Sequence, residues 1–429
     1  MDDIFRTYDV RGLYPSEVNE EFAYNLGLAF ANYIKGEILV CRDGRLSSES
    51  LKESFVKGVL DAGFDVLDIG LASTPYAYYA LLQRGKGGVV VTASHNPKDY
   101  NGFKLLKEKA YPISKGKGLE EIKELMNKTK NKSVKGTLKE KNYFKEYKDF
   151  LKKFLVKSDL KIIIDQSHGS GWIESSVLKE FYDAVLINND IDGNFPSHGP
   201  DPKQETNQEQ IKKLVLEKKA DLGVILDGDA DRVMFIDEKG SWIKPDLASL
   251  LLLEDFRDGV IVCDVACTKQ LAETAKEYGI KTIISKIGRT NISEKVHEIN
   301  ADYGVEVSGH AFFKEFNGFD NPFIKIAKLI KNMTLQKERL SSVLKKMSYY
   351  QSGEYNYKTN NKDDIIKKVK ELYKDYEQDE LDGLSIHAKD YWFNIRKSNT
   401  ESLLRLNVES KDKNTMKQIL KELKKIING

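Results

Sequence analysis

The chain has 429 residues and a mass of 48.9 kDa, which corresponds to about three domains of ordinary size, with two or four also compatible. Hydrophobic residues make up 40% of it and charged residues 31%, a composition that excludes disordered and fibrous proteins. The 68 Lys and Arg residues nearly balance the 66 Asp and Glu residues, whereas a dedicated nucleic-acid-binding protein usually carries a strong basic excess.

Alternating strands and helices are predicted along most of the chain, because short apolar runs alternate with segments whose apolar residues recur at helical spacing. The first round has helices at 47–61 and 75–83, where the serines at the start of 47–61 are possible caps. The strands of this round are expected at 37–41, 65–69 and 88–92. A βαβαβ order favours a parallel sheet with right-handed crossovers.

The same order recurs twice. The strands of the second and third rounds are expected at 161–164, 184–187, 222–226, 259–263, 282–285 and 303–305. The helices between them are expected at 173–181, 208–218, 268–278 and 291–300. From about Ser348 helices at 363–376 and 415–427 flank strands at 391–395 and 403–408, which predicts a smaller α+β domain. The lysine-rich stretch 104–157 is interpreted as a solvated helical face and a linker.

Targeting and cross-linking features are not found in the sequence. No apolar run approaches the roughly 18 residues of a membrane span, and the opening MDDIFR has no basic region followed by an apolar stretch. The three cysteines are too few for a disulfide framework and wrongly spaced for a zinc site. We therefore expect a cytoplasmic protein with neither a membrane nor a nucleic-acid partner.

A polar motif follows the last strand of each βαβαβ round. These motifs are TASHNP at 92–97, DGDADR at 227–232 and EVSGH at 306–310. Ligands of open α/β sheets bind beyond the carboxyl ends of the strands. Three motifs at equivalent positions in three similar units could therefore converge on one cleft.

The acidic motif predicts a magnesium site. Asp227, Asp229 and Asp231 alternate with small residues after an apolar strand, so their carboxylates can converge, and hard oxygen ligands suit Mg²⁺. A calcium-binding EF-hand loop is rejected, because Arg232 stands where that loop needs glycine and the flanking segments read as strands.

The other motifs predict phosphoryl transfer on a sugar. Ser94 is not in a G-x-S-x-G elbow, but a phosphoryl group on its hydroxyl would supply a further oxygen ligand for the metal. The 306–310 motif combines an acceptor, a hydroxyl and an imidazole that can bind sugar hydroxyls. The segment RKSNT at 396–400 combines a fixed cation with hydroxyls and can form a phosphate-binding nest. Together these parts describe phosphoryl transfer.

In this order, and over almost the whole chain, the motifs resemble those of the α-D-phosphohexomutases. The stretches that carry the resemblance are FRTYDVRG (5–12), TASHNP with DYNGFK (92–104), DGNFPSHGP (192–200), DGDADR (227–232), EVSGH (306–310) and RKSNTE (396–401). Within the family, DYNGFK, VSGHAFFKE followed by GFD, and SNTE followed by LRLNVES are most similar to bacterial-type phosphomannomutases and dual phosphomannomutase/phosphoglucomutases.

The resemblance implies a fold and an activity. The expected fold is α/β, with three related βαβαβ units of mostly parallel sheets and a smaller, mobile C-terminal α+β domain around a central cleft. The expected domains are 1–141, 142–243, 244–347 and 348–429. The expected activity is reversible interconversion of hexose 1-phosphate and hexose 6-phosphate, of mannose and of glucose, with Mg²⁺ and a hexose 1,6-bisphosphate as activator. The partner would be a small phosphosugar, and the protein a monomer or small homo-oligomer.

Residue roles follow from the same resemblance. Ser94 would carry a phosphoryl group and bind Mg²⁺ together with the three aspartates, and Glu306 and Ser308 would hold sugar O3 and O4. The non-reacting phosphate would be held by Arg396, Ser398, Asn399 and Thr400. The residues expected to line the reacting centre are Arg11, Lys104, Arg232 and His310, and the general acid/base is either Lys104 or His310. Further candidates are Tyr8, His95, Lys286 and Arg289, of which Arg289 stands where the dual-specificity enzymes usually have histidine.

Three other functions compete with this reading. A phosphoglucosamine mutase usually has serine rather than threonine before Ala-Ser-His, whereas Thr92 stands in this motif. A non-catalytic sugar-phosphate-binding protein would not need an intact Ser94 with all three aspartates and Arg232. A simple Mg²⁺ phosphatase would explain the aspartates but not the EVSGH and RKSNT segments.

Overall fold

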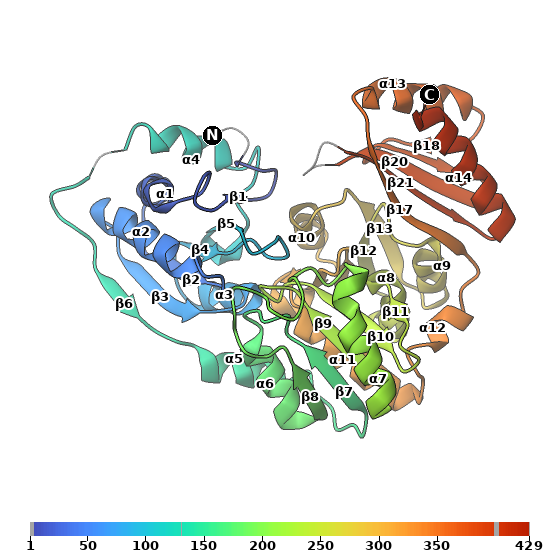
Figure 1. Ribbon diagram of the computed structural model, residues 1–429, viewed down its shortest axis with the longest axis horizontal. Helices are drawn as coiled ribbons and strands as arrows, with labels where there is room; N and C mark the ends of the chain where they lie inside the picture. Colours follow the sequence, from blue (N-terminus) through green and yellow to red (C-terminus); the bar gives the residue numbers. More distant parts are fainter. Residues whose placement is uncertain (1–3, 130, 399–402, 429) are drawn as a thin grey trace. The chain divides into compact units, whose positions relative to one another are not determined.

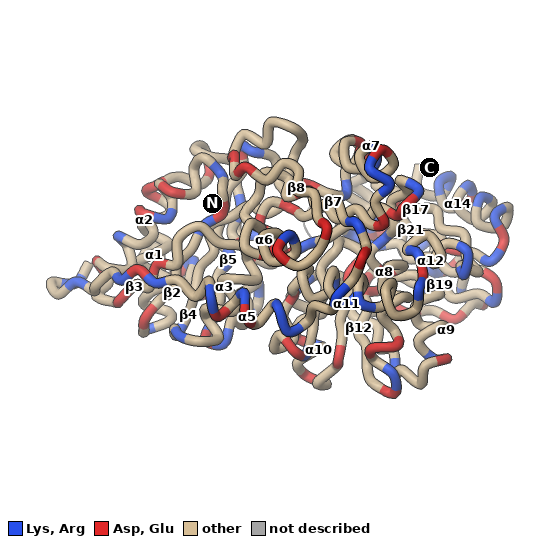
Figure 2. Tube along the Cα trace, turned by 90° about the horizontal axis from the view of Figure 1, so that it is seen from below, with Lys and Arg blue, Asp and Glu red and all other residues tan. Residues whose placement is uncertain are grey.

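The computed structural model describes residues 4–129, 131–398 and 403–428. The chain forms two compact units, of which the first comprises Met1–Lys244 with Ser308–Ser341 and the second Pro245–Val307 with Ser342–Gly429. Among the helices in these described ranges, none is both long and apolar enough to cross a membrane. Lys and Arg residues are interspersed with Asp and Glu residues along the trace (Figure 2), in keeping with the near balance of the two.

The first unit begins with a six-stranded sheet in the order β1-β5-β4-β2-β3-β6. Its strands are β1 (Val10–Leu13), β2 (Ile38–Arg42), β3 (Val66–Leu71), β4 (Gly87–Val91), β5 (Tyr100–Lys107) and β6 (Leu138–Glu140). The neighbours of β2, which are β3 and β4, run parallel to it, whereas β5 runs antiparallel to both β4 and β1. The antiparallel pair β1 and β5 thus extends the predicted parallel core at one side.

Helices cover both faces of this sheet (Figure 1). They are α1 (Glu20–Ile34), α2 (Ser48–Asp61), α3 (Thr74–Gln83) and α4 (Leu119–Met126). The rings of Phe22, Phe30, Phe55 and Phe103 pack together where α1 and α2 meet the sheet. On the other face, Leu81 of α3 packs over the backbone of Gly88 in β4. Because both faces are covered, the central strands are mostly apolar, with Arg42 and Asp68 as charged exceptions in β2 and β3.

The second sheet of this unit has the order β11-β10-β9-β7-β8. Its strands are β7 (Lys161–Asp165), β8 (Asp183–Ile187), β9 (Leu222–Leu226), β10 (Val233–Asp237) and β11 (Trp242–Ile243), and its helices are α5 (Phe144–Lys152), α6 (Trp172–Phe181) and α7 (Glu209–Lys218). The strand β7 is parallel to β8 and β9, whereas β10 returns antiparallel to β9. Residues 308–341 add β15 (Ala311–Phe313), β16 (Phe319–Asp320) and α11 (Pro322–Gln336) to the unit.

The second unit contains a parallel set of strands and an antiparallel sheet. The parallel strands are β12 (Val260–Asp264), β13 (Lys281–Ser285) and β14 (Tyr303–Val305), and the helices that accompany them are α8 (Pro245–Ala248), α9 (Lys269–Glu277), α10 (Arg289–Glu298) and α12 (Ser342–Lys345). The antiparallel sheet, in the order β17-β21-β20-β19-β18, consists of β17 (Tyr350–Lys358), β18 (Glu377–Asp379), β19 (Leu384–His387), β20 (Tyr391–Lys397) and β21 (Leu403–Ser410). An apolar core joins this sheet to α13 (Lys362–Leu372) and α14 (Lys413–Asn428).

The predicted α/β class with parallel central strands is confirmed, and several local interpretations are corrected. The stretch 104–157 does not begin as a solvated helical face, because its first residues belong to β5, where Phe103, Lys104 and Leu105 are buried. Ser47 does not cap α2 through its side chain, and its hydroxyl instead accepts a hydrogen bond from Asn101 Nδ2 at 2.8 Å. Short 3₁₀ helices are Glu108–Ala110, Glu205–Gln208, Ser249–Phe256 and Lys314–Phe316. The four domain boundaries remain predictions.

Candidate active site

Ser94 lies in the loop between β4 and β5, with its backbone in the left-handed region at φ 53°. The side chain is buried, and its Oγ donates a hydrogen bond to Asp227 Oδ2 at 2.7 Å. The backbone N–H of Ser94 donates to Thr92 Oγ1 at 2.8 Å, which steadies the turn. The serine hydroxyl therefore meets the acidic motif, which lies 133 residues further along the chain.

The acidic motif is the turn of the β9–β10 hairpin. Leu226 pairs with Val233, so residues 227–232 must reverse the chain, and Ala230 adopts φ 55°. Oxygen atoms of Asp227, Asp229 and Asp231 lie within 4.8 Å of one another, and all three side chains are fully buried. The hairpin geometry explains why carboxylates at alternating positions converge.

Lys104 faces these carboxylates from β5. Its ammonium donates to Asp231 Oδ2 at 2.5 Å, to Thr74 Oγ1 at 3.2 Å and also to Asp229 Oδ2. Lys104 is opposite Val90 in the antiparallel pairing of β5 with β4, so the strand places it near the end of β4 that leads to Ser94. The buried lysine thus supplies the nearest positive charge to two of the aspartates.

The three aspartates differ in their electrostatics. Burial raises the pKa of Asp227 well above its ordinary value, and the charges of Asp229 and Asp231 add to the effect. Burial and the Asp231 charge also raise the pKa of Asp229, but attraction and hydrogen bonds from Lys104, with a hydrogen bond from Thr74, outweigh them and leave the pKa below its ordinary value.

The donor set fits a divalent cation. Asp229 Oδ1 is buried and accepts no hydrogen bond from any described residue, and carboxylate oxygens are the ligands that Mg²⁺ prefers. An unsatisfied buried oxygen is costly unless something binds it. Asp227, Asp229 and Asp231 form one group in the described part of the chain that could hold a metal ion, and their role as ligands remains a prediction.

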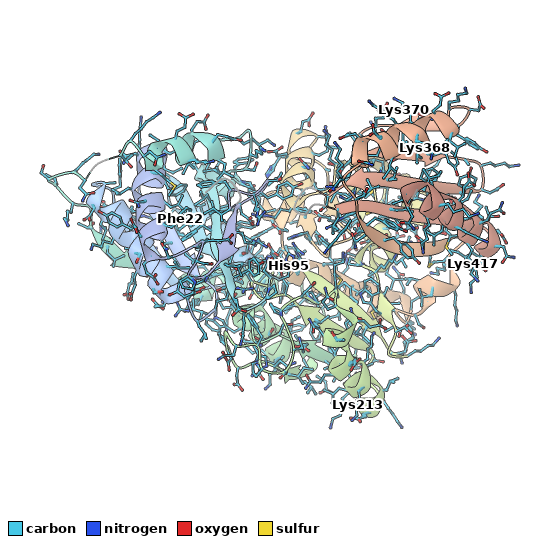
Figure 3. All side chains as sticks on the ribbon, turned by 45° about the horizontal axis from the view of Figure 1, so that its top comes forward. Phe22, His95, Lys213, Lys368, Lys370 and Lys417 are labelled. Atoms are coloured by element: carbon cyan, nitrogen blue, oxygen red, sulfur yellow. The ribbon has the colours of Figure 1, made fainter. Side chains whose placement is uncertain are left out.

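Arg11 and His95 lie around Ser94. Arg11, in β1, donates from Nη1 to Asn96 Oδ1 at 2.8 Å and from Nη2 to Asp9 Oδ2 at 2.6 Å. His95, labelled in Figure 3, has its Nδ1 3.4 Å from Ser94 Oγ. Burial, followed by the charges of Arg232 and Arg11, lowers the pKa of His95 well below its ordinary value, so its ring is neutral at pH 7.

The imidazole of His310 lies between the side chains of Arg232 and Asp320. Its Nε2 accepts a hydrogen bond from Arg232 Nε at 3.0 Å, because a guanidinium group can only donate. The neutral ring then carries its proton on Nδ1, which lies 2.7 Å from Asp320 Oδ2. Arg232 Nε is also 3.9 Å from oxygens of Asp227 and Asp231. These contacts connect the imidazole to the acidic turn.

Several predicted residues belong to the second unit. Glu306 follows β14 and is buried, and Asp264 holds the adjacent loop by accepting the N–H of Val307 at 3.0 Å. Burial, with the charge of Glu306 second, raises the pKa of Asp264 to about 7. Arg289, at the start of α10, is buried, whereas Lys286 is exposed.

The predicted phosphate-binding segment is described only in part. Arg396 is buried, with Nη2 3.1 Å from Glu354 Oε2, and the N–H of Ser398 donates to the carbonyl oxygen of Leu403 at 2.9 Å. Asn399 and Thr400 lie outside the described residues. In the first unit, Tyr8 and Ser308 are partly exposed. The structure therefore gathers Ser94, the aspartates, Lys104, Arg11, His95, Arg232 and His310, and the roles of all these residues remain predictions.

Some residues that position the side chains around Ser94 and the acidic turn were not predicted from the sequence. They include Arg45, Thr74, Asn96 and Asp320. The segment Ser73-Thr74-Pro75 has the pattern of a helix start, and Ser73 does cap α3 by accepting the N–H of Tyr76. No local sequence pattern indicates that Thr74 Oγ1 donates a hydrogen bond to Asp229 Oδ2 at 2.5 Å. Asp320 lies in the GFD segment (318–320), whose only signal in the sequence is the family resemblance.

Comparisons with known proteins agree with these motifs. Residues 2–133, 141–240 and 247–350 match alpha/beta/alpha domains I, II and III of the phosphoglucomutase/phosphomannomutase family, and residues 354–426 match its C-terminal domain. The chain is 38% identical to a phosphomannomutase of Methanocaldococcus jannaschii over 99% of this chain and 97% of that protein. It is 35% identical to a phosphomannomutase of Escherichia coli over 95% of each.

Solved structures show the same fold. A phosphoglucomutase/phosphomannomutase family protein from Burkholderia thailandensis superposes with a TM-score of 0.92 at 27% identity, covering 99% of this chain and 97% of that one. An N-acetylphosphoglucosamine mutase of Aspergillus fumigatus, solved with GlcNAc-6P and magnesium, shares the fold at a TM-score of 0.61 and 12% identity, covering 99% and 95% of the two chains. The alternative of a non-catalytic binding protein is therefore set aside, and the chain belongs to the phosphoglucomutase/phosphomannomutase family of α-D-phosphohexomutases, as a phosphohexose mutase and thus an isomerase.

Proposed function

We propose that this phosphohexomutase interconverts mannose 1-phosphate and mannose 6-phosphate, and the corresponding glucose phosphates, through a phosphoserine at Ser94 and a hexose 1,6-bisphosphate. The observation that carries the proposal is the hydrogen bond from Ser94 Oγ to Asp227, with Lys104 and Arg232 beside the same acidic turn. Relatives named phosphomannomutase at 35–38% identity support mannose as the sugar.

The charges around Ser94 favour a phosphorylated hydroxyl with a metal. Phosphoserine carries about −1.5 to −2 charge at pH 7, which would meet three buried carboxylates. Lys104 and Arg232 offset part of this charge through their contacts with the aspartates. Asp227, Asp229, Asp231 and the phosphoryl group would hold Mg²⁺, which when bound neutralises charge developing at phosphorus.

The transfer step needs a group that takes a proton. A hydroxyl of the hexose phosphate forms a new O–P bond while the bond between phosphorus and Ser94 Oγ breaks, and the hydroxyl proton must leave. The Lys104 ammonium donates to two carboxylates and a hydroxyl, so it has no lone pair to offer. His310 has one on Nε2, and Asp320 holds the opposite nitrogen. We therefore assign the general base to His310, which must release Arg232 to act.

The return step reverses these roles. Ser94 Oγ, which left as an alkoxide in the first step, forms a bond to the phosphorus of the other phosphate while the bond between that phosphorus and the sugar oxygen breaks, and His310 returns the proton to the sugar oxygen. Added hexose 1,6-bisphosphate would rephosphorylate Ser94 in enzyme that has lost the group, which explains an activator role. Glu306 and Ser308 would bind the sugar hydroxyls, and Arg396, Ser398, Asn399 and Thr400 the phosphate that does not react.

Mass spectrometry and a coupled assay test this function. After incubation with hexose 1,6-bisphosphate and Mg²⁺, peptide mass spectrometry should locate one phosphoryl group on Ser94. Ser94→Ala should lose nearly all mutase activity, whereas Ser16→Ala, which changes an exposed serine, should keep it. A phosphoryl group on another residue, or near-normal turnover by Ser94→Ala, would overturn the mechanism.

The same assay decides the sugar. Mannose, glucose and glucosamine 1-phosphates are compared at equal bisphosphate and Mg²⁺ concentrations. We expect turnover of the mannose and glucose compounds. A strong preference for the glucosamine compound would identify a phosphoglucosamine mutase instead.

A further inference from the structure

The segment 190–200, which contains the DGNFPSHGP motif, supplies none of the groups that transfer the phosphoryl group, yet it packs against Arg45, whose side chain binds the Ser94 loop. The ring of Phe195 faces the guanidinium of Arg45, with Arg45 Cζ 5.3 Å from the ring centroid. Phe195 is buried and adopts φ 51°. An aromatic residue keeps this left-handed conformation only where its surroundings over-determine it.

Arg45 is a buried residue whose hydrogen bonds converge on one loop. Its side chain is about 1% exposed. Nη1 and Nη2 donate at 2.6–3.0 Å to the backbone carbonyl oxygens of Ser94, Asn96, Pro97 and Tyr100. Nε donates to Asp43 Oδ2 at 3.2 Å, so all five N–H donors of the guanidinium are used. Arg45 therefore fixes the path of the backbone from the carbonyl group of Ser94 to that of Tyr100, on the C-terminal side of Ser94 Cα.

The segment that carries Phe195 is itself held firmly. A Cβ atom at Gly193 would lie 2.4 Å from the backbone nitrogen of Leu46, so the segment lies flush against the residue after Arg45. His168 links its two ends, because Nδ1 lies 2.9 Å from the carbonyl oxygen of Asp190 and Nε2 lies 2.9 Å from Ser197 Oγ. Phe195 is thus presented to Arg45 by a backbone with little freedom.

We propose that Arg45 and Phe195 are positioning residues for phosphoryl transfer. Arg45 holds the carbonyl groups of the Ser94 loop, and Phe195 covers the guanidinium and keeps water from competing for those carbonyls. Ser94 Oγ then stays directed at Asp227. The inference rests on the proposed phosphoserine function. A displacement of about 1 Å at a reacting centre can lower a rate about 100-fold, so the effect should be on the transfer rate and not on substrate affinity.

Three variants isolate the two contacts. Phe195→Leu keeps apolar bulk but removes the aromatic face, whereas Phe195→Tyr keeps the face. Arg45→Lys keeps the charge, but one ammonium cannot reproduce the forked contacts of a guanidinium. Phe181→Leu makes the same exchange as Phe195→Leu at a residue of α6 that is 41% exposed and serves as the matched control.

The readout is the rate per phosphorylated enzyme. Each protein is phosphorylated with labelled hexose 1,6-bisphosphate, and its phosphoserine content is measured by intact mass. Single-turnover transfer is then followed by rapid quench over a range of hexose phosphate concentrations up to saturation, and KM is taken from steady-state turnover of the same proteins. Normalising to phosphoserine removes any loss of folded protein, so a merely structural role would leave the rate constant unchanged. We expect a fall of about tenfold for Phe195→Leu and about 100-fold for Arg45→Lys, with KM within about threefold of wild type. Phe195→Tyr and Phe181→Leu should match wild type.

The outcomes separate this inference from the proposed function. If Phe195→Leu and Phe195→Tyr transfer at the same rate, or if only KM changes, the positioning role is wrong while the phosphoserine mechanism stands. The comparison of Phe195→Leu with Phe195→Tyr tests the positioning role even if Arg45→Lys does not fold. If wild-type enzyme acquires no phosphoryl group on Ser94, the proposed function fails, and the inference fails with it.

Discussion

Replacing Lys104 with methionine isolates what its buried ammonium does for the acidic turn. The Lys104 side chain is 2% exposed, and the Asp229 and Asp231 side chains that it contacts are fully buried. Methionine has similar length and no charge, so the variant leaves two buried carboxylates without their nearest cation. Breaking a buried ion pair in this way costs about 3–5 kcal/mol. At about 2–4 °C per kcal/mol, the unfolding midpoint in EDTA should fall by about 6–20 °C.

Magnesium should reverse much of this loss. A bound cation neutralises the same carboxylates, and the variant has lost the ammonium that competes for them, so Mg²⁺ should raise the midpoint more in Lys104→Met than in wild type. Thermal unfolding by circular dichroism over a Mg²⁺ titration measures both effects. The control is Lys213→Met, at a residue labelled in Figure 3. The Lys213 side chain is 76% exposed, and its Nζ lies 3.6 Å from Glu217 Oε1.

Two results would refute this reasoning. A Lys104→Met midpoint equal to that of wild type in EDTA would show that the ammonium does not stabilise the aspartates. Equal Mg²⁺-dependent shifts in the two proteins would show that the metal and Lys104 do not share carboxylates. The Lys213→Met control should stay within about 1 kcal/mol of wild type, as expected for an exposed pair.

Further predictions concern pH, phosphate binding, the metal and the sugar. The pKa of Asp264 rises from 3.8 to about 7 on folding. The protonated carboxyl group therefore contributes up to about 4 kcal/mol to the free energy of unfolding below pH 4, and this contribution is lost as the pH rises to 7. Urea unfolding of wild type, but not of Asp264→Asn, should show this decline. Arg396→Ala should weaken binding of both the 1- and 6-phosphosugars by about 10- to 150-fold, and weakening of only one, measured by equilibrium binding, would contradict alternating substrate orientations. Asp229→Asn should keep its far-ultraviolet dichroism but lose most of its turnover, and full activity at limiting Mg²⁺ would contradict the metal assignment. The kcat/KM values for mannose and glucose 1-phosphates should lie within about 100-fold, because strong discrimination of one hydroxyl needs a dedicated partner.

Local sequence patterns were sufficient to predict those helices and strands whose own residues determine their structure. The parallel strands β2, β3, β4, β7, β9 and β12 were predicted within a residue or two, because a strand buried on both faces reads as a short, mostly apolar run. The acidic turn was recognisable for a similar reason, since three aspartates in one short segment after such a strand have few other uses. Motif order then indicated the family without any knowledge of the tertiary structure.

Elements stabilised by distant partners could not be predicted in this way. The strand β5 was missed because Lys104 and Lys107 suggest a solvated segment, yet the lysine in its middle is buried against carboxylates 125 and 127 residues away. Arg45 likewise appears in the sequence as an ordinary charged residue, and only the folded Ser94 loop gives its five donors their acceptors.

The sequence by itself thus determined the alternation of strands and helices, the chemical groups available for phosphoryl transfer and the family. Only the tertiary structure decided which charges are buried together, that His310 lies between Arg232 and Asp320, and that Phe195 covers Arg45. The physical reason is that apolar periodicity reports the local environment of a chain segment. The stability of a buried charge depends instead on partners that folding brings from elsewhere in the chain.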